Sequence, residues 1–189
     1  MLEVILASAS PRRREILKNA GIDFRVVAAD IDESTEKTAP HEVVLDISKR
    51  KAEAVAKKTD GIVIAADTVV ALDGEILGKP KDDEDAFRML RALSGREHEV
   101  YTGVCVIRGD RCDSFYEKTK VFFRDMTDDI IKAYIETGEP RDKAGAYAIQ
   151  GKCAAYITRI EGDYLNVVGL PLSRLCQLLE GNGYLHEFF

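Results

Sequence analysis

The sequence VILASASPRRR, residues 4–14, contains the change of pattern that decides the fold class. Residues 4–7 are apolar and predict a short buried strand, and residues 8–10 predict a loop. A helix is predicted from Pro11, where proline is favoured in the first turn, to about Ala20. A strand that passes through a short loop into a helix is a typical unit of α/β proteins.

Further strands and helices follow along the chain. A long helix is predicted over residues 40–58, and an apolar strand over residues 62–66 is predicted to end at Asp67. The pair Asp73-Gly74, between two apolar runs, predicts a hairpin turn. The mixed order of elements indicates one α/β domain with a partly antiparallel sheet.

Capping residues place three more helices. Asp82 predicts the start of a helix that reaches about Leu93, and Thr127 predicts a shorter helix that Gly138 ends. A final helix is predicted to begin at Pro171.

Composition excludes several functional classes. The 189 residues are 46% hydrophobic and carry a net charge of −6, which argues against a general nucleic-acid binder. No apolar run reaches the roughly 20 residues of a membrane span, and the N-terminal stretch lacks the basic region of a signal peptide. The four cysteines form no C-x-x-C pair and are expected to be reduced thiols. We therefore expect a cytoplasmic protein without a membrane or nucleic-acid partner.

Three consecutive arginines occupy an unfavourable place. Arg12, Arg13 and Arg14 fall in the first turn of a helix, where the helix dipole favours acidic residues. A bound polyphosphate would accept from the free N–H groups of that turn and from Ser8 or Ser10, while the guanidinium groups contact its oxygens. The alternative is that the arginines extend into water and pair with surface carboxylates.

Other charged residues suggest a site for a phosphate and a metal. Lys51 lies on the apolar face of the helix over residues 40–58, so it either extends to solvent or points into a cleft. Asp67 and Glu33 offer carboxylate oxygens, which Mg²⁺ or Mn²⁺ prefers. Lys79 and Lys143 stand beside glycine or proline in loops. Taken alone, Asp67 or Glu33 is more often an ordinary cap or surface carboxylate, and each loop lysine is more often solvated than bound to a ligand.

Five segments together resemble the Maf family of nucleotide pyrophosphatases, once associated with septum formation. They are LASASPRR (6–13), ADTVV (66–70), GKP (78–80), DKAGAYAIQG (142–151) and NVVGLPL (166–172). The resemblance covers essentially the whole chain and implies one Maf-like catalytic domain over residues 1–189.

The resemblance implies an ITPase-like (Maf/HAM1-type) α/β fold, with a twisted mixed sheet, flanking helices and two lobes around a cleft. It also implies a homodimer and a divalent cation, Mg²⁺ or Mn²⁺. The expected reaction cleaves a nucleoside triphosphate between the α and β phosphates. The catalytic residue is expected at Asp67, as general base or as metal ligand. The implied phosphate and metal contacts are Ser8, Arg13, Glu33, Lys51, Lys79 and Lys143.

Three positions indicate the branch of the family that acts on dTTP and UTP. That branch resembles this chain in having Arg12, Thr68 and Gln150, whereas the 7-methyl-GTP branch has an aromatic residue, a glutamine and a glutamate there. The Gln150 amide can donate and accept, which suits the edge of a neutral uracil or thymine. Cys153 and Ala154 depart from the family pattern of small residues, which affects only the expected flexibility of that loop.

Two other functions stay open at this level. The chain could be a house-cleaning hydrolase of modified pyrimidine nucleotides, or a nucleotide-binding regulator of cell division. Cations gathered around carboxylates favour catalysis over binding alone.

Overall fold

The computed structural model of the protein describes residues 3–184. Its strands are β1 (Val4–Leu6), β2 (Phe24–Val26), β3 (Ile62–Leu72), β4 (Glu75–Leu77), β5 (Glu97–Arg108), β6 (Arg111–Phe123) and β7 (Ile157–Glu161). Its helices are α1 (Pro11–Asn19), α2 (Pro40–Ala56), α3 (Asp83–Leu93), α4 (Asp128–Glu136), α5 (Tyr164–Val168) and α6 (Leu172–Gly181). Three short 3₁₀ turns are η1 (Glu139–Asp142), η2 (Ala144–Ala146) and η3 (Lys152–Tyr156).

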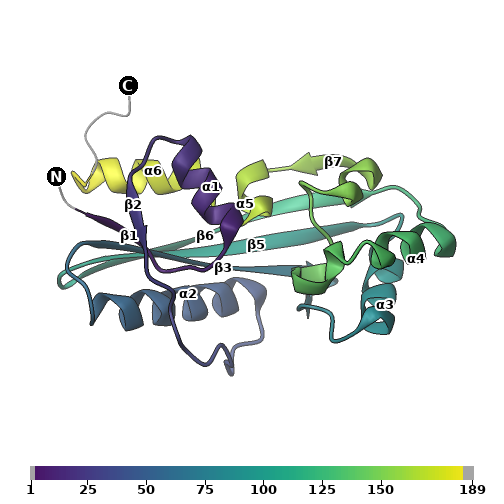
Figure 1. Ribbon diagram of the computed structural model, residues 1–189, viewed down its shortest axis with the longest axis horizontal. Coiled ribbons are helices and arrows are strands. Elements are labelled where there is room, and N and C mark those ends of the chain that lie inside the picture. Colours follow the sequence, from purple (N-terminus) through teal and green to yellow (C-terminus); the bar gives the residue numbers. More distant parts are fainter. Residues whose placement is uncertain (1–2, 185–189) are drawn as a thin grey trace.

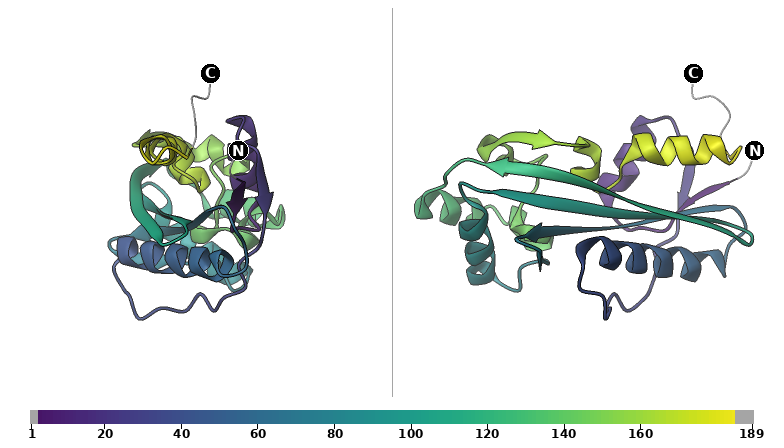
Figure 2. Two further views of the ribbon diagram at one scale, coloured as in Figure 1. Left: turned by 90° about the vertical axis from the view of Figure 1, so that its left-hand side faces the viewer. Right: turned by 180° about the vertical axis from the view of Figure 1, so that it is seen from behind.

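One mixed sheet runs through the molecule in the order β2-β1-β3-β5-β6-β7, with β4 paired to β3. β1 is parallel to β2 and to β3, and the remaining pairs are antiparallel. Helix α2 covers one face of the sheet, and α1 and α6 lie on the opposite face (Figures 1 and 2). The expected twisted mixed sheet with flanking helices is therefore confirmed.

The molecule is elongated because the long strands β3, β5 and β6 run along its long axis from one end to the other (Figure 1). One lobe holds β1, β2, α1, α2 and α6, and the other holds β4, β7, α3 and α4. Side chains that come from both lobes meet near the middle of β3.

The predicted end of a strand at Asp67 is wrong. β3 continues without interruption through Asp67 to Leu72, and the Asp67 backbone pairs with Gly103 of β5. The strand continues because its backbone pairs with β5 on both sides of Asp67, and a lysine of α2 compensates the charge of the carboxylate. Asp67 thus projects from the middle of a long central strand.

Helix α2 approaches the sheet closely at Gly103. A Cβ at this position would overlap the Val44 carbonyl of α2, so only glycine fits without a shift of the helix. Because Gly103 pairs with Asp67, this contact fixes α2 beside the strand that carries the carboxylate. Lys51 lies two helical turns beyond Val44.

Candidate nucleotide site

A cleft of about 660 Å³ lies between the two lobes. Every site residue predicted from the sequence lines it: Ser8, Arg12, Arg13, Glu33, Lys51, Asp67, Thr68, Lys79, Lys143 and Gln150. The order of the strands explains part of this convergence. Leu6 at the end of β1 pairs with Ile64 of β3, so the loop after β1 passes beside Asp67.

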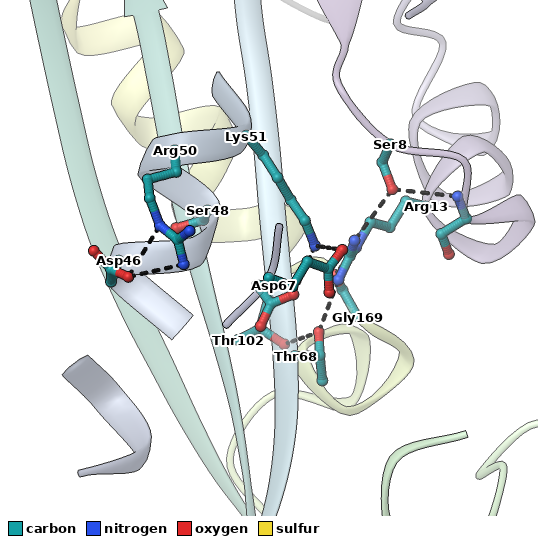
Figure 3. A network of polar contacts seen from close by, with 12 residues as sticks. Ser8, Arg13, Asp46, Ser48, Arg50, Lys51, Asp67, Thr68, Thr102 and Gly169 are labelled. Atoms are coloured by element: carbon teal, nitrogen blue, oxygen red, sulfur yellow. Dashed lines mark hydrogen bonds and ion pairs between the residues drawn. The ribbon is translucent and has the colours of Figure 1, made fainter. Parts of the chain in front are cut away.

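A lysine lies between two carboxylates at the floor of the cleft. Figure 3 shows its pairing with one of them, Asp67. The Lys51 Nζ is 2.8 Å from Asp67 Oδ1 and 2.9 Å from Glu33 Oε1. Lys51 and Asp67 are 9% and 8% exposed, whereas Glu33 is exposed on the loop before α2. Two charged groups as buried as Lys51 and Asp67 must neutralise each other. The carboxylate of Glu33, by contrast, faces the open cleft.

Arg13 turns from the first turn of α1 into the protein (Figure 3). Its Nε donates to the Gly169 carbonyl at 2.7 Å, Nη1 to Ser8 Oγ at 3.1 Å and Nη2 to Thr68 Oγ1 at 3.0 Å. A guanidinium has five N–H groups, so within residues 3–184 two of them remain for a ligand. Burial lowers the pKa of Arg13, and the nearby Asp67 charge opposes this shift. Because the ordinary pKa of an arginine side chain is so high, Arg13 stays protonated in spite of its burial.

The three arginines differ in their positions, although the sequence predicts a common role in contacting phosphate oxygens. Arg12 is half-buried and lines the cleft, whereas Arg14 is exposed and donates to the Ala9 carbonyl. Ser10 occupies the N-cap position, but its side chain makes no capping hydrogen bond. The Ser8 hydroxyl instead accepts from the Ser10 N–H at 3.2 Å. Since no side chain within the described part of the chain caps α1, the N–H groups of its first turn stay available to an acceptor.

A buried hydrogen-bond chain supports Thr68, and the sequence reasoning missed its other members. Thr102 donates its hydroxyl proton to the Asn166 carbonyl at 2.9 Å, so in the 2.9 Å contact between the two threonines Thr68 is the donor. Thr68 therefore presents only lone pairs, and one of these accepts from Arg13. Thr102 and Asn166 are fully buried. The Asn166 amide fixes this arrangement by donating to Thr119 Oγ1 and to the Val100 carbonyl.

The opposite lobe contributes the other predicted residues. The Gly145 N–H donates to the Gly78 carbonyl at 3.0 Å, which joins the loop of Lys79 to the segment of Lys143. Lys79 is exposed, and Lys143 pairs with the neighbouring carboxylate of Asp142. Asp142 had no assigned role in the sequence analysis.

Positive charge prevails in the cleft although the whole chain is acidic. Five basic and three acidic residues line the cleft, whereas the net charge of the chain is −6. Such local enrichment attracts an anionic ligand and holds it against a low-dielectric wall. The geometry suits a polyphosphate, with neutral hydrogen-bonding groups such as the exposed Gln150 amide at the rim.

Known proteins match both the sequence and the fold. The Maf-like protein family matches residues 3–182. The chain is 51% identical over 186 residues to a dTTP/UTP pyrophosphatase of Carboxydothermus hydrogenoformans, covering 97% of this chain and 100% of the relative. It is 50% identical over 184 residues to a protein of the same name from Lachnoclostridium phytofermentans, covering 94% and 93%.

Solved structures of two HAM1 proteins share the architecture. The Ham1 protein of Staphylococcus aureus superimposes with a TM-score of 0.57 at 19% identity, covering 95% of this chain and 99% of the other. The HAM1 protein of Coxiella burnetii gives a TM-score of 0.55 at 14% identity, covering 96% and 100%. These likenesses confirm the expected ITPase-like fold. The match of the Maf-like family over residues 3–182 and the relatives at 50–51% identity show that the chain belongs to the Maf family.

Proposed function

We propose that this protein hydrolyses dTTP and UTP between the α and β phosphates, releasing the nucleoside monophosphate and pyrophosphate. The observation that carries the proposal is the Lys51 ammonium between Asp67 and Glu33, at the floor of a cleft lined by further cations. Relatives named dTTP/UTP pyrophosphatase at 50–51% identity over nearly the whole chain support the choice of substrate.

In the proposed reaction, water attacks the α-phosphorus and the bond from that phosphorus to the bridging oxygen breaks. Arg13 and the first-turn N–H groups of α1 bind phosphate oxygens on one side of the cleft. Lys79 and Lys143 contact the phosphates from the opposite side and neutralise charge on the departing pyrophosphate. Asp67 lines the cleft beside Lys51, where it can orient the attacking water and take its proton.

A divalent cation, Mg²⁺ or Mn²⁺, is part of the proposal. Each of Asp67 and Glu33 has only one carboxylate oxygen paired with Lys51, which leaves an oxygen on each for a hard cation. No cluster of three or more His, Cys, Asp or Glu side chains suited to a metal is found within residues 3–184. Protein sites for Mg²⁺ often use one or two carboxylates and complete the shell with substrate phosphates and water. A cation bound in this way would neutralise phosphate charge and activate water.

The proposal includes a cytoplasmic homodimer that takes a free nucleotide rather than a nucleic acid. Among the described residues, no helix is both long and apolar enough to cross a membrane. Light scattering after gel filtration tests the dimer.

A panel of triphosphates tests the function. Purified protein is incubated with Mg²⁺ or Mn²⁺ and dTTP, UTP, CTP, GTP or modified uridine triphosphates, and pyrophosphate and orthophosphate are measured separately. We expect pyrophosphate from dTTP and UTP and none without a divalent cation. Release of orthophosphate alone, or no turnover of any nucleotide, would refute the proposed reaction.

A further inference from the structure

The segment that carries Gln150 is held at both of its ends by two residues of other elements. Gln150 is exposed at the rim of the cleft, in the turn between η2 and η3. Its neighbours in the chain are much less exposed: Ile149 is buried and Gly151 half-buried. The side chain is therefore free to meet a ligand while its backbone is fixed.

Tyr134 of α4 and Glu139 of η1 supply the two points of attachment. The Tyr134 hydroxyl accepts from the Ala148 N–H at 3.2 Å and donates to Glu139 Oε1 at 2.7 Å. The other carboxylate oxygen, Glu139 Oε2, accepts from the Lys152 N–H at 3.1 Å. The two amides lie two residues before and two residues after Gln150, so one continuous hydrogen-bond relay spans the turn.

Gly151 confirms how closely the carboxylate lies against this turn. A Cβ at Gly151 would overlap the carboxylate of Glu139. The φ of Gly151 is −108°, so a larger residue here would not strain the backbone but would displace the Glu139 carboxylate. The residue directly after Gln150 is thus shaped to admit the Glu139 side chain.

We propose that Tyr134 and Glu139 are positioning residues that set base selectivity by orienting Gln150. The inference rests on the proposed function and extends it, because it assigns selectivity to two residues that line no part of the cleft. Without the relay, the Gln150 amide samples several orientations and its hydrogen bonds to a pyrimidine edge become weaker. Asp67, Lys51 and Arg13 belong to other elements and keep their contacts.

The relay keeps its hydrogen-bond donor over a wide range of pH. Burial raises the pKa of the Tyr134 hydroxyl far above its ordinary value, and the hydrogen bond to Glu139 adds to the shift. Tyr134 therefore remains a donor at any pH where the enzyme is assayed.

Three substitutions test the relay: Glu139→Ala, Glu139→Gln and Tyr134→Phe. The readouts are kcat and KM for dTTP and CTP, which differ on the base edge, and the dissociation constants of both nucleotides by calorimetry. For Glu139→Ala we expect the ratio of kcat/KM for dTTP over CTP to fall about tenfold through KM, with kcat within about threefold. Tyr134→Phe is expected to lower the ratio as well. Glu139→Gln should restore part of it, because the amide oxygen can still accept from Lys152 N–H.

Two controls separate positioning from general damage. Glu136→Ala removes an exposed carboxylate of α4, the helix that carries Tyr134, and should leave both kinetic constants unchanged. Gln150→Ala gives the ratio expected when the base-reading amide is absent. A Glu139→Ala enzyme with the wild-type ratio, or one that loses kcat equally for both nucleotides, would overturn the inference.

Failure of the proposed function gives a different result. If the wild-type protein binds dTTP in preference to CTP without releasing pyrophosphate, the proposed reaction fails, and the binding ratios of the variants still decide the role of the relay. A wild-type protein that releases pyrophosphate but binds dTTP and CTP equally would overturn the inference about the relay and leave the proposed reaction standing.

Discussion

Asp67 carries two functions that a substitution can separate. Its carboxylate compensates the buried Lys51 ammonium at 2.8 Å, and it faces the cleft in which the triphosphate is proposed to bind. Asp67→Asn keeps the shape and one oxygen but removes the negative charge. We expect kcat for dTTP to fall at least about 100-fold, the range typical for loss of a general acid–base group. Steady-state kinetics measure the loss, and thermal unfolding shows whether the fold remains.

Alanine at the same position provides the contrast. Asp67→Ala leaves the Lys51 ammonium with Glu33 as its one carboxylate partner among the described residues. Loss of a buried partner costs about 1–3 kcal/mol and more when the group is charged, so this variant should also be less stable than Asp67→Asn. Full activity in either variant would contradict the role proposed for Asp67.

Thr68 is predicted to act on the phosphate through Arg13. Thr68→Val removes the acceptor of Arg13 Nη2 and the donor to Thr102, with little change in volume. A hydrogen bond to a charged group contributes about 1.5–3 kcal/mol, and a tenfold change in affinity corresponds to about 1.4 kcal/mol. We expect KM for dTTP to rise about tenfold or more, as measured by initial rates.

The matched control is Thr68→Ser, which keeps the hydroxyl. It should stay close to wild type, whereas equal KM values for the serine and valine variants would show that the hydroxyl has no part in binding.

At the scale of elements, the packing of α2 on β5 determines the distance from Lys51 to Asp67. Gly103→Ala places a methyl group against the Val44 carbonyl and forces α2 away from the strand. Overpacking of this kind costs about 1–3 kcal/mol. We expect a lower unfolding free energy and a lower kcat/KM together, because the shift separates the lysine from the carboxylate. Chemical denaturation and initial rates measure the two effects.

Gly181→Ala is the control for that substitution. Gly181 ends α6, and a Cβ there meets no atom within 4 Å. Alanine should leave activity unchanged and stability equal or slightly higher. If Gly103→Ala behaved in the same way, the close packing of α2 would not matter for the site.

Elements with strong local signals could be predicted from the sequence. Asp82 and Thr127 cap α3 and α4 by accepting from the backbone N–H three residues ahead, as their positions indicated. Asp73 and Gly74 both have positive φ, as the predicted hairpin turn requires. In each case the determining contacts lie within a few residues, so a local pattern contains them.

Features that depend on distant contacts could not be predicted in this way. The continuation of β3 through Asp67 depends on its pairing with β5, in which Thr68 lies opposite Thr102, 34 residues further along the chain. The direction of Arg13 depends on the Gly169 carbonyl, 156 residues further along the chain. The sequence also gave no sign of α5, whose five residues are too few for a periodic pattern. The candidate residues were identified by their chemical type and by resemblance, but their partners came from the tertiary fold.

At the scale of the whole molecule, stability depends on pH through a buried histidine. His98 of β5 is 2% exposed, and its ring packs edge-on against Phe123 and Tyr147. The His98 Nε2 atom shares a 2.7 Å hydrogen bond with the Tyr147 hydroxyl. The other ring nitrogen, Nδ1, is buried and has no hydrogen-bond partner among the described residues. A second proton would place an unpaired charge inside the core.

The pKa of His98 falls accordingly from 6.5 to about 4. Above pH 6.5 both the folded and the unfolded states hold this histidine neutral, and between pH 6.5 and 4 the unfolded state takes up a proton that the folded state does not. Stability therefore decreases as pH falls through that window. At about 1.4 kcal/mol for each pH unit, His98 lowers the unfolding free energy by about 2 kcal/mol between pH 7.5 and pH 5.

His98→Gln isolates this contribution, because an amide can still form a hydrogen bond with the Tyr147 hydroxyl and does not titrate. Urea unfolding at pH 7.5 and pH 5 should show a decrease in unfolding free energy that is smaller in the variant by about 2 kcal/mol, the remainder coming from groups common to both proteins. Because Tyr147 borders the cleft and precedes the turn of Gln150, the variant should also show which part of an activity loss at low pH comes from unfolding. A variant with the same pH dependence as wild type would mean that His98 takes up its proton equally in both states, and that its burial does not govern acid stability.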